Sequence, residues 1–142
     1  MRAAVVIAVA VCVIVIVVIT FWPTPVDRPV HREISDALDQ LHHAGVPSQM
    51  NYSFVEFSAN VALFLPLGAL IALLVMPPLW GVSGVLGLTL SLCVEFCQYL
   101  FLPQRFASPY DLASNTLGAL LGGVIVAIVR WSFYRSQRHP VP

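Results

Sequence analysis

Seven polar residues stand within or beside apolar runs of this 142-residue chain, and their types could carry chemistry. Three are acids, which could act as an acid or a base, one is an arginine and three are amides. Together they could hold the head group of an amphiphile, because a guanidinium pairs well with phosphate or carboxylate. The seven residues are Glu56, Asn60, Glu95, Gln98, Arg105, Asp111 and Asn115.

The composition indicates the kind of element that must position these residues. Apolar residues make up 58% of the chain and charged residues 10%, against about 45–50% and about 25% in soluble domains. A small soluble domain cannot bury so much apolar surface, so the bilayer must be the solvent for most of it. The formal net charge is zero, which argues against a nucleic-acid partner.

Four apolar runs are long enough to span a membrane as helices, which takes about 20 residues. The first could instead be a signal peptide, but it is longer than a usual signal core. It also ends in Phe21, Trp22 and Pro23 instead of a cleavage site, so we expect an uncleaved anchor. The expected spans cover about residues 3–21, 54–76, 79–101 and 111–129.

The polar segment after the first span predicts a short amphipathic helix over about residues 28–45. Val30, Ile34, Leu38 and Leu41 recur at helical spacing between charged residues, as in helices that lie on a membrane surface or cap a bundle. The fold predicted is an all-α membrane protein, a four-helix transmembrane bundle with this extracytoplasmic helix after the first span. We expect an anchor and amphipathic segment (1–53), a three-helix core (54–130) and a basic cytoplasmic tail (131–142).

Arginine counts favour an orientation with both termini in the cytoplasm. The cytoplasmic side would then hold four arginines and the outer side three, together with most of the acids. At about 1.5 Å per residue, all seven polar residues fall at the outer ends of their antiparallel spans. Small residues would bring the helices together in the inner half. The glycines expected at helix contacts are Gly68, Gly84, Gly87, Gly118 and Gly122.

Each polar residue has a structural explanation beside the functional one. Asn and Gln can join helices by hydrogen bonds, and Asp111 can complement the dipole of the fourth helix. Glu95 is the exception, because a carboxyl about two turns inside the bilayer needs a partner, and Arg105 is the nearest candidate in sequence. We expect no metal, no cofactor, and only a role as small buried hydrophobes for Cys93 and Cys97.

The same residues carry a family resemblance. Asn60, Phe64, Pro66 and Gly68 match the N-x-x-x-F-x-P-L-G signature of VanZ-like membrane proteins. Glu95 with Gln98, then Arg105, then Asp111-x-x-x-Asn115-x-x-Gly118-x-x-x-Gly122, resembles the second block of that family. The resemblance covers about residues 54–125 and implies a protein of the bacterial cytoplasmic membrane. The namesake of the family is associated with resistance to the glycopeptide teicoplanin.

Three hypotheses of function follow. In the first, the outer cluster binds or shields a lipid-linked cell-wall precursor or a glycopeptide antibiotic. In the second, a membrane enzyme acts on a phospholipid or polyprenyl-phosphate head group, with Glu95 as acid or base, Arg105 as phosphate clamp and Asp111 as a further candidate. In the third, the cluster only locks the bundle. The absence of a Ser-His-Asp arrangement or a nucleotide loop favours a non-enzyme, with membrane lipid as a partner and the oligomeric state open.

Overall fold

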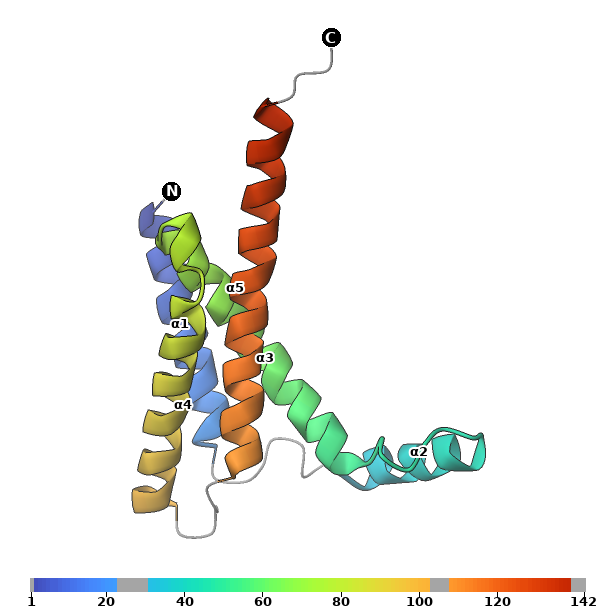
Figure 1. Cartoon of the computed structure of the whole chain (residues 1–142). Helices are drawn as coiled ribbons and strands as arrows, with labels where there is room; N and C mark the ends of the chain where they lie inside the picture. The colour runs from blue at the N-terminus through green and yellow to red at the C-terminus, as the bar shows by residue number, and fades with distance from the viewer. Residues whose placement is uncertain (1, 23–30, 103–107, 139–142) are drawn as a thin grey trace.

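The structure, a computed structural model, describes residues 2–22, 31–102 and 108–138. It is all-helical over these residues, as expected, and Figure 1 shows the chain of helices. In chain order they are α1 (Arg2–Thr20), α2 (His31–His43), α3 (Tyr52–Leu74), the short 3-10 helix η1 (Pro77–Leu79), α4 (Val82–Phe101) and α5 (Pro109–Arg138).

Four of these segments are long and apolar enough to cross a membrane. They are α1, α3, the η1–α4 segment and α5. Their large apolar side chains point outward at many positions, for example Ile7 at 64%, Val85 at 63% and Ile128 at 56% exposure. In water such a surface would aggregate, whereas in a bilayer it meets lipid chains. The chain therefore has the architecture of a multi-pass membrane protein.

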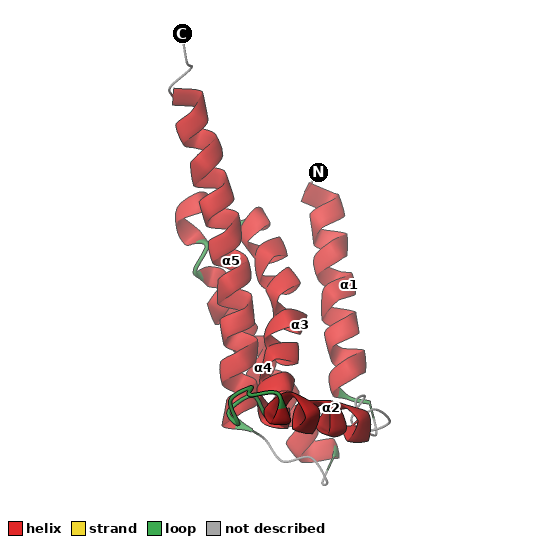
Figure 2. Cartoon of the chain, turned by 90° about the vertical axis from the view of Figure 1, so that its right-hand side faces the viewer, coloured by secondary structure: helices red, strands yellow, loops and turns green. Residues whose placement is uncertain are grey.

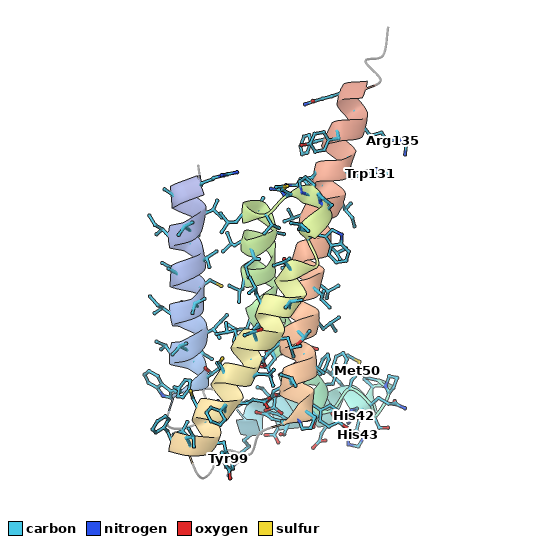
Figure 3. The ribbon with its side chains drawn as sticks, turned by 60° about the vertical axis from the view of Figure 1, so that its left-hand side comes forward. His42, His43, Met50, Tyr99, Trp131 and Arg135 are labelled. Carbon is cyan, nitrogen blue, oxygen red and sulfur yellow. The ribbon has the colours of Figure 1, made fainter. Side chains whose placement is uncertain are left out.

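The four spans alternate in direction, and α2 lies crosswise where α3 begins (Figures 1 and 2). We call that end the α2 end; α1 and α4 finish there, and α3 and α5 start there. At the opposite end lie Arg2, the first residue of α1, and the last turns of α5, with Arg130 and Arg135. We call it the basic end. Figure 3 shows the contrast, with Tyr99, His42 and His43 at one end and Trp131 and Arg135 at the other.

The closest helix contact joins α3 and α5, which run in the same direction. A Cβ added to Gly68 would collide with the backbone of Ala119, one added to Gly118 with the backbone of Val61, and one added to Gly122 with the backbone of α3 from residue 65 to 69. Small residues allow this approach, and the dispersion contacts it creates drive helix association in lipid. Pro66 lies within this part of α3, and the helix continues through it.

The helix α4 covers the other side of α5 through smaller contacts. Gly84 faces the side chain of Leu120, and Gly87 faces the Cβ of Ala119. The fully buried Ser83 donates from Oγ to the Gly68 carbonyl at 2.9 Å, which ties α4 to α3 as well. The helix α1 packs on the outside of α3, where Ile16 joins a small apolar core of Phe64, Leu67 and Ile71.

The fourth span is longer than the sequence predicted. The expected span ends at about residue 129, whereas α5 continues as helix to Arg138, through the first part of the expected basic tail. Arg130, expected at the edge of the tail, instead donates to the carbonyls of Ala72, Leu73 and Val75 at 2.9–3.0 Å. The last carbonyls of a helix have no partner within it, so the guanidinium caps α3 and fixes α5 beside it.

Two smaller expectations also change. The amphipathic segment forms helix over His31–His43, a shorter range than the expected 28–45, whose residues 28–30 lie outside the described residues. Cys93 is exposed on the surface of α4, and Cys97 is partly buried, so the expected burial is wrong for Cys93. Both positions face the surroundings of the bundle at least in part and have no bonded partner among the described residues.

The glycine contact between α3 and α5 makes a first prediction. Replacing Gly122 with Ala should lower the melting temperature of the detergent-solubilised protein, because overpacking a close contact costs about 1–3 kcal/mol. Gly81→Ala is the matched control, since a Cβ there meets nothing within 4 Å. Equal melting temperatures for the two variants would show that the α3–α5 contact is not tight in the folded protein.

Candidate functional site

The start of α5 places Asp111 at the α2 end of the bundle. The Ser108 carbonyl accepts the backbone N–H groups of Asp111 and Leu112 at 3.0 and 3.2 Å, and Pro109 is the first helical residue. Pro is well suited to that position because its missing N–H would have no helical partner. Asp111 thus lies in the first turn, where the helix dipole stabilises a negative charge.

Asn60 on α3 holds the carboxylate of Asp111. Its Nδ2 donates to Oδ1 of Asp111 at 2.9 Å, and the bond is partly buried. The two residues are 51 positions apart in sequence and meet because α3 and α5 start at the same end. The bond holds the carboxylate against α3, and Glu95 on α4 interacts electrostatically with Asp111.

The facing residues of α4 and α5 follow an antiparallel register. Asn115 donates from Nδ2 to Oγ of Ser91 at 2.9 Å, in a buried contact, and Gly87 lies against Ala119 one turn further on. From the Ser91–Asn115 pair, one helical turn towards the α2 end, the same register places Glu95 opposite Asp111. Ser91 is fully buried and Asn115 is 6% exposed, whereas Glu95 and Asp111 are partly buried, so the row runs from the interior towards the α2 end.

Two acceptor oxygens in this row have no hydrogen-bond partner among the described residues. They are Oε1 of Glu95 and Oδ1 of Asn115, and both are buried. A buried acceptor without a donor costs about 1–3 kcal/mol. They belong to what we call the acid–amide cluster, defined as Asn60, Ser91, Glu95, Asp111 and Asn115. The cluster contains unused acceptor capacity inside the bilayer-spanning part of the chain.

The remaining expected site residues lie around the cluster in different ways. Gln98 donates from Nε2 to the Thr20 carbonyl at 2.8 Å, which ties the end of α4 to the last turn of α1. Glu56 is exposed one turn before Asn60, towards the α2 end. Arg105 lies outside the described residues. The structure therefore brings four of the seven together, and places Gln98 at a helix contact and Glu56 at the surface.

Sequence reasoning missed Ser91 as a partner of the amide and Arg130 as the cap of α3. Ser91 stands one helical turn before Glu95, which is a usable signal for a shared face. The role of Arg130 depends on the α3–α5 contact, and no local pattern reveals it. Among the described residues, no group of three or more His, Cys, Asp or Glu side chains could hold a metal ion.

These features define a class, a four-span helical membrane protein with a cluster of acids and amides between its spans at one end. The model of the VanZ/LLP1 family matches residues 7–130. The chain belongs to the VanZ/LLP1 family. The match begins inside α1, so the first span and α2 are part of the family unit, beyond residues 54–125 that carry the motifs. No curated protein and no solved structure matches the chain.

The Ser91–Asn115 bond supplies a second prediction. Ser91→Ala should lower the melting temperature of the solubilised protein, because it leaves the buried Asn115 amide without its acceptor at a cost of about 1–3 kcal/mol. Ser58→Ala is the control, since that exposed hydroxyl bonds only the Phe54 carbonyl of its own helix. If Ser58→Ala destabilises the protein as much as Ser91→Ala, the buried amide is not held through this bond.

Proposed function

We propose that this protein binds the polar part of an amphiphilic cell-envelope molecule at the acid–amide cluster. The molecule is a lipid-linked cell-wall precursor or a glycopeptide of the teicoplanin type, and binding limits access of the antibiotic to its target. One observation carries the proposal: Glu95 and Asn115 present buried acceptor oxygens that the described residues leave without donors. Intramembrane ionisable residues are costly and mark binding sites more often than they serve stability.

The chemistry of the cluster favours a ligand rich in hydrogen-bond donors. Carboxylate and amide oxygens accept from hydroxyl, amide N–H or ammonium groups, and sugars, peptides and aminated head groups all carry them. A donor that reaches both oxygens recovers the desolvation cost of these two acceptors. Asn60 holds Asp111 at 2.9 Å, so part of the site is already in place before a ligand arrives. Arg105, in the connection between α4 and α5, would complement a phosphate.

The membrane placement proposed is the bacterial cytoplasmic membrane, with both termini inside and the cluster outside. The distribution of charge supports it. The basic end has Arg2, Arg130 and Arg135, and cytoplasmic flanks of membrane proteins are enriched in arginine. All acids of the described residues lie on α2, near the start of α3, near the end of α4 or at the start of α5. The helix α2 would then lie on the outer surface of the cytoplasmic membrane.

This orientation is testable by labelling. Cysteine introduced at Asp39 on α2 should react with a membrane-impermeant maleimide in intact cells, and cysteine at Ser136 on α5 should react only after the membrane is opened. The background for both is a variant with Cys12, Cys93 and Cys97 replaced by Ala. The reverse pattern would place the cluster on the cytoplasmic side and remove the basis for contact with an external antibiotic.

The binding proposal is tested by neutralising Glu95. Cells that express Glu95→Gln should lose protection against teicoplanin. They should bind more fluorescently labelled teicoplanin than wild-type cells if the ligand is the precursor, and less if it is the glycopeptide. The amide removes a charge-assisted acceptor, which weakens binding about tenfold or more. Glu33→Gln, which neutralises an exposed carboxylate on α2, is the control and should protect like the wild type. Immunoblots of the membrane fraction check that all variants reach equal levels.

Each other result has a definite meaning. If Glu95→Gln protects as well as the wild type at equal levels, the cluster is not the binding site. If wild-type cells resemble cells with an empty vector, the protein does not limit antibiotic access. A new lipid species that appears with the wild type and disappears with Glu95→Gln would show an enzyme, and the binding proposal would be replaced by that activity.

A further inference from the structure

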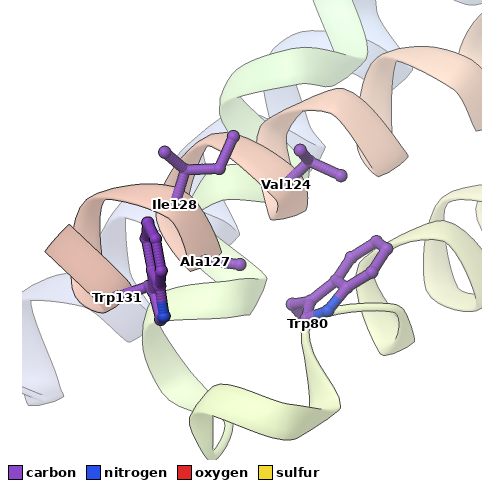
Figure 4. A pocket seen from close by; sticks show the side chains of 5 residues that line it. All are labelled: Trp80, Val124, Ala127, Ile128 and Trp131. Atoms are coloured by element: carbon purple, nitrogen blue, oxygen red, sulfur yellow. The ribbon is translucent and has the colours of Figure 1, made fainter.

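An apolar groove opens at the basic end, the end of the bundle opposite the acid–amide cluster. It has a volume of about 330 Å³ and is lined by Trp80, Val124, Ala127, Ile128 and Trp131 (Figure 4). Trp80 comes from the turn between α3 and α4, and the other four come from α5. The volume is at the lower end of the range of about 300–1,000 Å³ for ligand sites.

The groove lies where α5 passes beyond its neighbours. Thirty residues of helix extend about 45 Å, well beyond the hydrocarbon thickness of about 30 Å, and Figure 1 shows the last turns of α5 beyond the other spans. Trp80 and Trp131 are 38% and 61% exposed. Indole rings in such positions lie at the level of the lipid head groups, so the groove begins in the hydrocarbon and ends at the interface.

The α5 side of the groove continues into a cation. Val124, Ile128, Trp131 and Arg135 follow one another at four- and three-residue steps, so they share one face of the helix. The Arg135 guanidinium lies 5.2 Å from the centre of the Trp131 ring. Along this face the character changes from aliphatic to aromatic to cationic, in the order in which a phospholipid presents its acyl chain, its glycerol region and its phosphate.

The charge at this end is of one sign. The sequence has no acid between residues 57 and 94 or after Asp111, so α5 beyond its first turn and the turn at Trp80 bring no carboxylate side chain to Arg135. Arg130 is already engaged by carbonyls at the end of α3. Within the described part of the chain, the Arg135 guanidinium contacts only the Trp131 ring. A guanidinium stacked in this way keeps its N–H fork available for phosphate.

We propose that the groove and Arg135 together form a binding site for one anionic phospholipid, with an acyl chain along Val124 and Ile128 and the phosphate at Arg135. The site is independent of the acid–amide cluster and of any antibiotic. It anchors the projecting turn of α5 at the membrane surface, and it would be occupied in the resting protein.

Fluorescence quenching in vesicles tests the site directly. The full chain with Trp22→Phe, which leaves Trp80 and Trp131 as reporters, is reconstituted in dioleoylphosphatidylcholine containing brominated phosphatidylglycerol or, at equal bromine content, brominated phosphatidylcholine. The anionic lipid should quench more strongly. Arg135→Gln should reduce this preference about fivefold, with quenching by brominated phosphatidylcholine unchanged. Each variant is compared with itself in unbrominated lipid, which removes any effect on the intrinsic fluorescence of Trp131.

Two further variants separate a built site from general attraction. Arg2→Gln removes a cation from the same end on α1 and should leave the preference intact; an equal loss would mean that the charge of the basic end acts diffusely, and the site would be rejected. Ala127→Phe fills the groove and should reduce quenching by both brominated lipids, and unchanged quenching would show that no acyl chain lies there. Equal quenching by the two lipids in the Trp22→Phe protein would also overturn the proposal.

Discussion

The backbone contact between α3 and α5 is the constraint on which the other features depend. The two helices are parallel neighbours separated in sequence by all of α4, and their glycines leave no room for a side chain between them. A contact that tight admits one relative placement, because a shift by one residue would drive a side chain into a backbone. Asn60 therefore meets Asp111 at one end, and Arg130 meets the last carbonyls of α3 at the other.

The lipid environment explains why the interior is built from small and polar residues. Helices in a bilayer gain nothing by exchanging lipid contacts for apolar protein contacts, so close packing and interhelical hydrogen bonds hold them together. Ser83 and Ser91 are fully buried, and each bonds another helix. Large apolar side chains mostly face outward. The polar residues of the cluster thus contribute to stability, and only their unsatisfied oxygens suggest more than that.

The sequence predicts the parts of the fold that depend on local composition. Run length and apolarity place the first three spans and the start of the fourth within a few residues, because a bilayer of fixed thickness requires helices of about 20 residues. The position of the polar residues near one end also follows from counting along each span. The extension of α5 to Arg138 was not predicted, since a run such as Arg130–Arg138 is polar and resembles a tail. The contacts of Arg130 with the α3 carbonyls are likewise long-range interactions that no local pattern reveals.

In the acid–amide cluster, too, the sequence predicts the depth of the residues but not their contacts. Sequence spacing puts Glu95 and Asp111 at similar depth, but it cannot decide which of the seven residues contact one another. That choice depends on helix register, which the glycines fix. Gln98 shares a depth with Glu95, yet its amide bonds the Thr20 carbonyl at the end of α1. A backbone carbonyl at a helix end has no sequence signature of its own, so a partner of this kind can be found only in three dimensions.

Acids and arginines lie at opposite ends of the bundle, and the two ends differ in how well their polar groups are paired. At the α2 end, acids and amides lie between helices, and two buried acceptors have no donor within residues 2–22, 31–102 and 108–138. At the basic end, cations lie on an exposed helix face or cap a helix, and none is left buried and unpaired among the residues described. The cost of unsatisfied groups is therefore concentrated at one end. Because protein stability is marginal, this cost is significant, and under the binding proposal a donor-rich ligand would relieve it. The basic end needs no such ligand, since the described cations there cap a helix or lie on an exposed face.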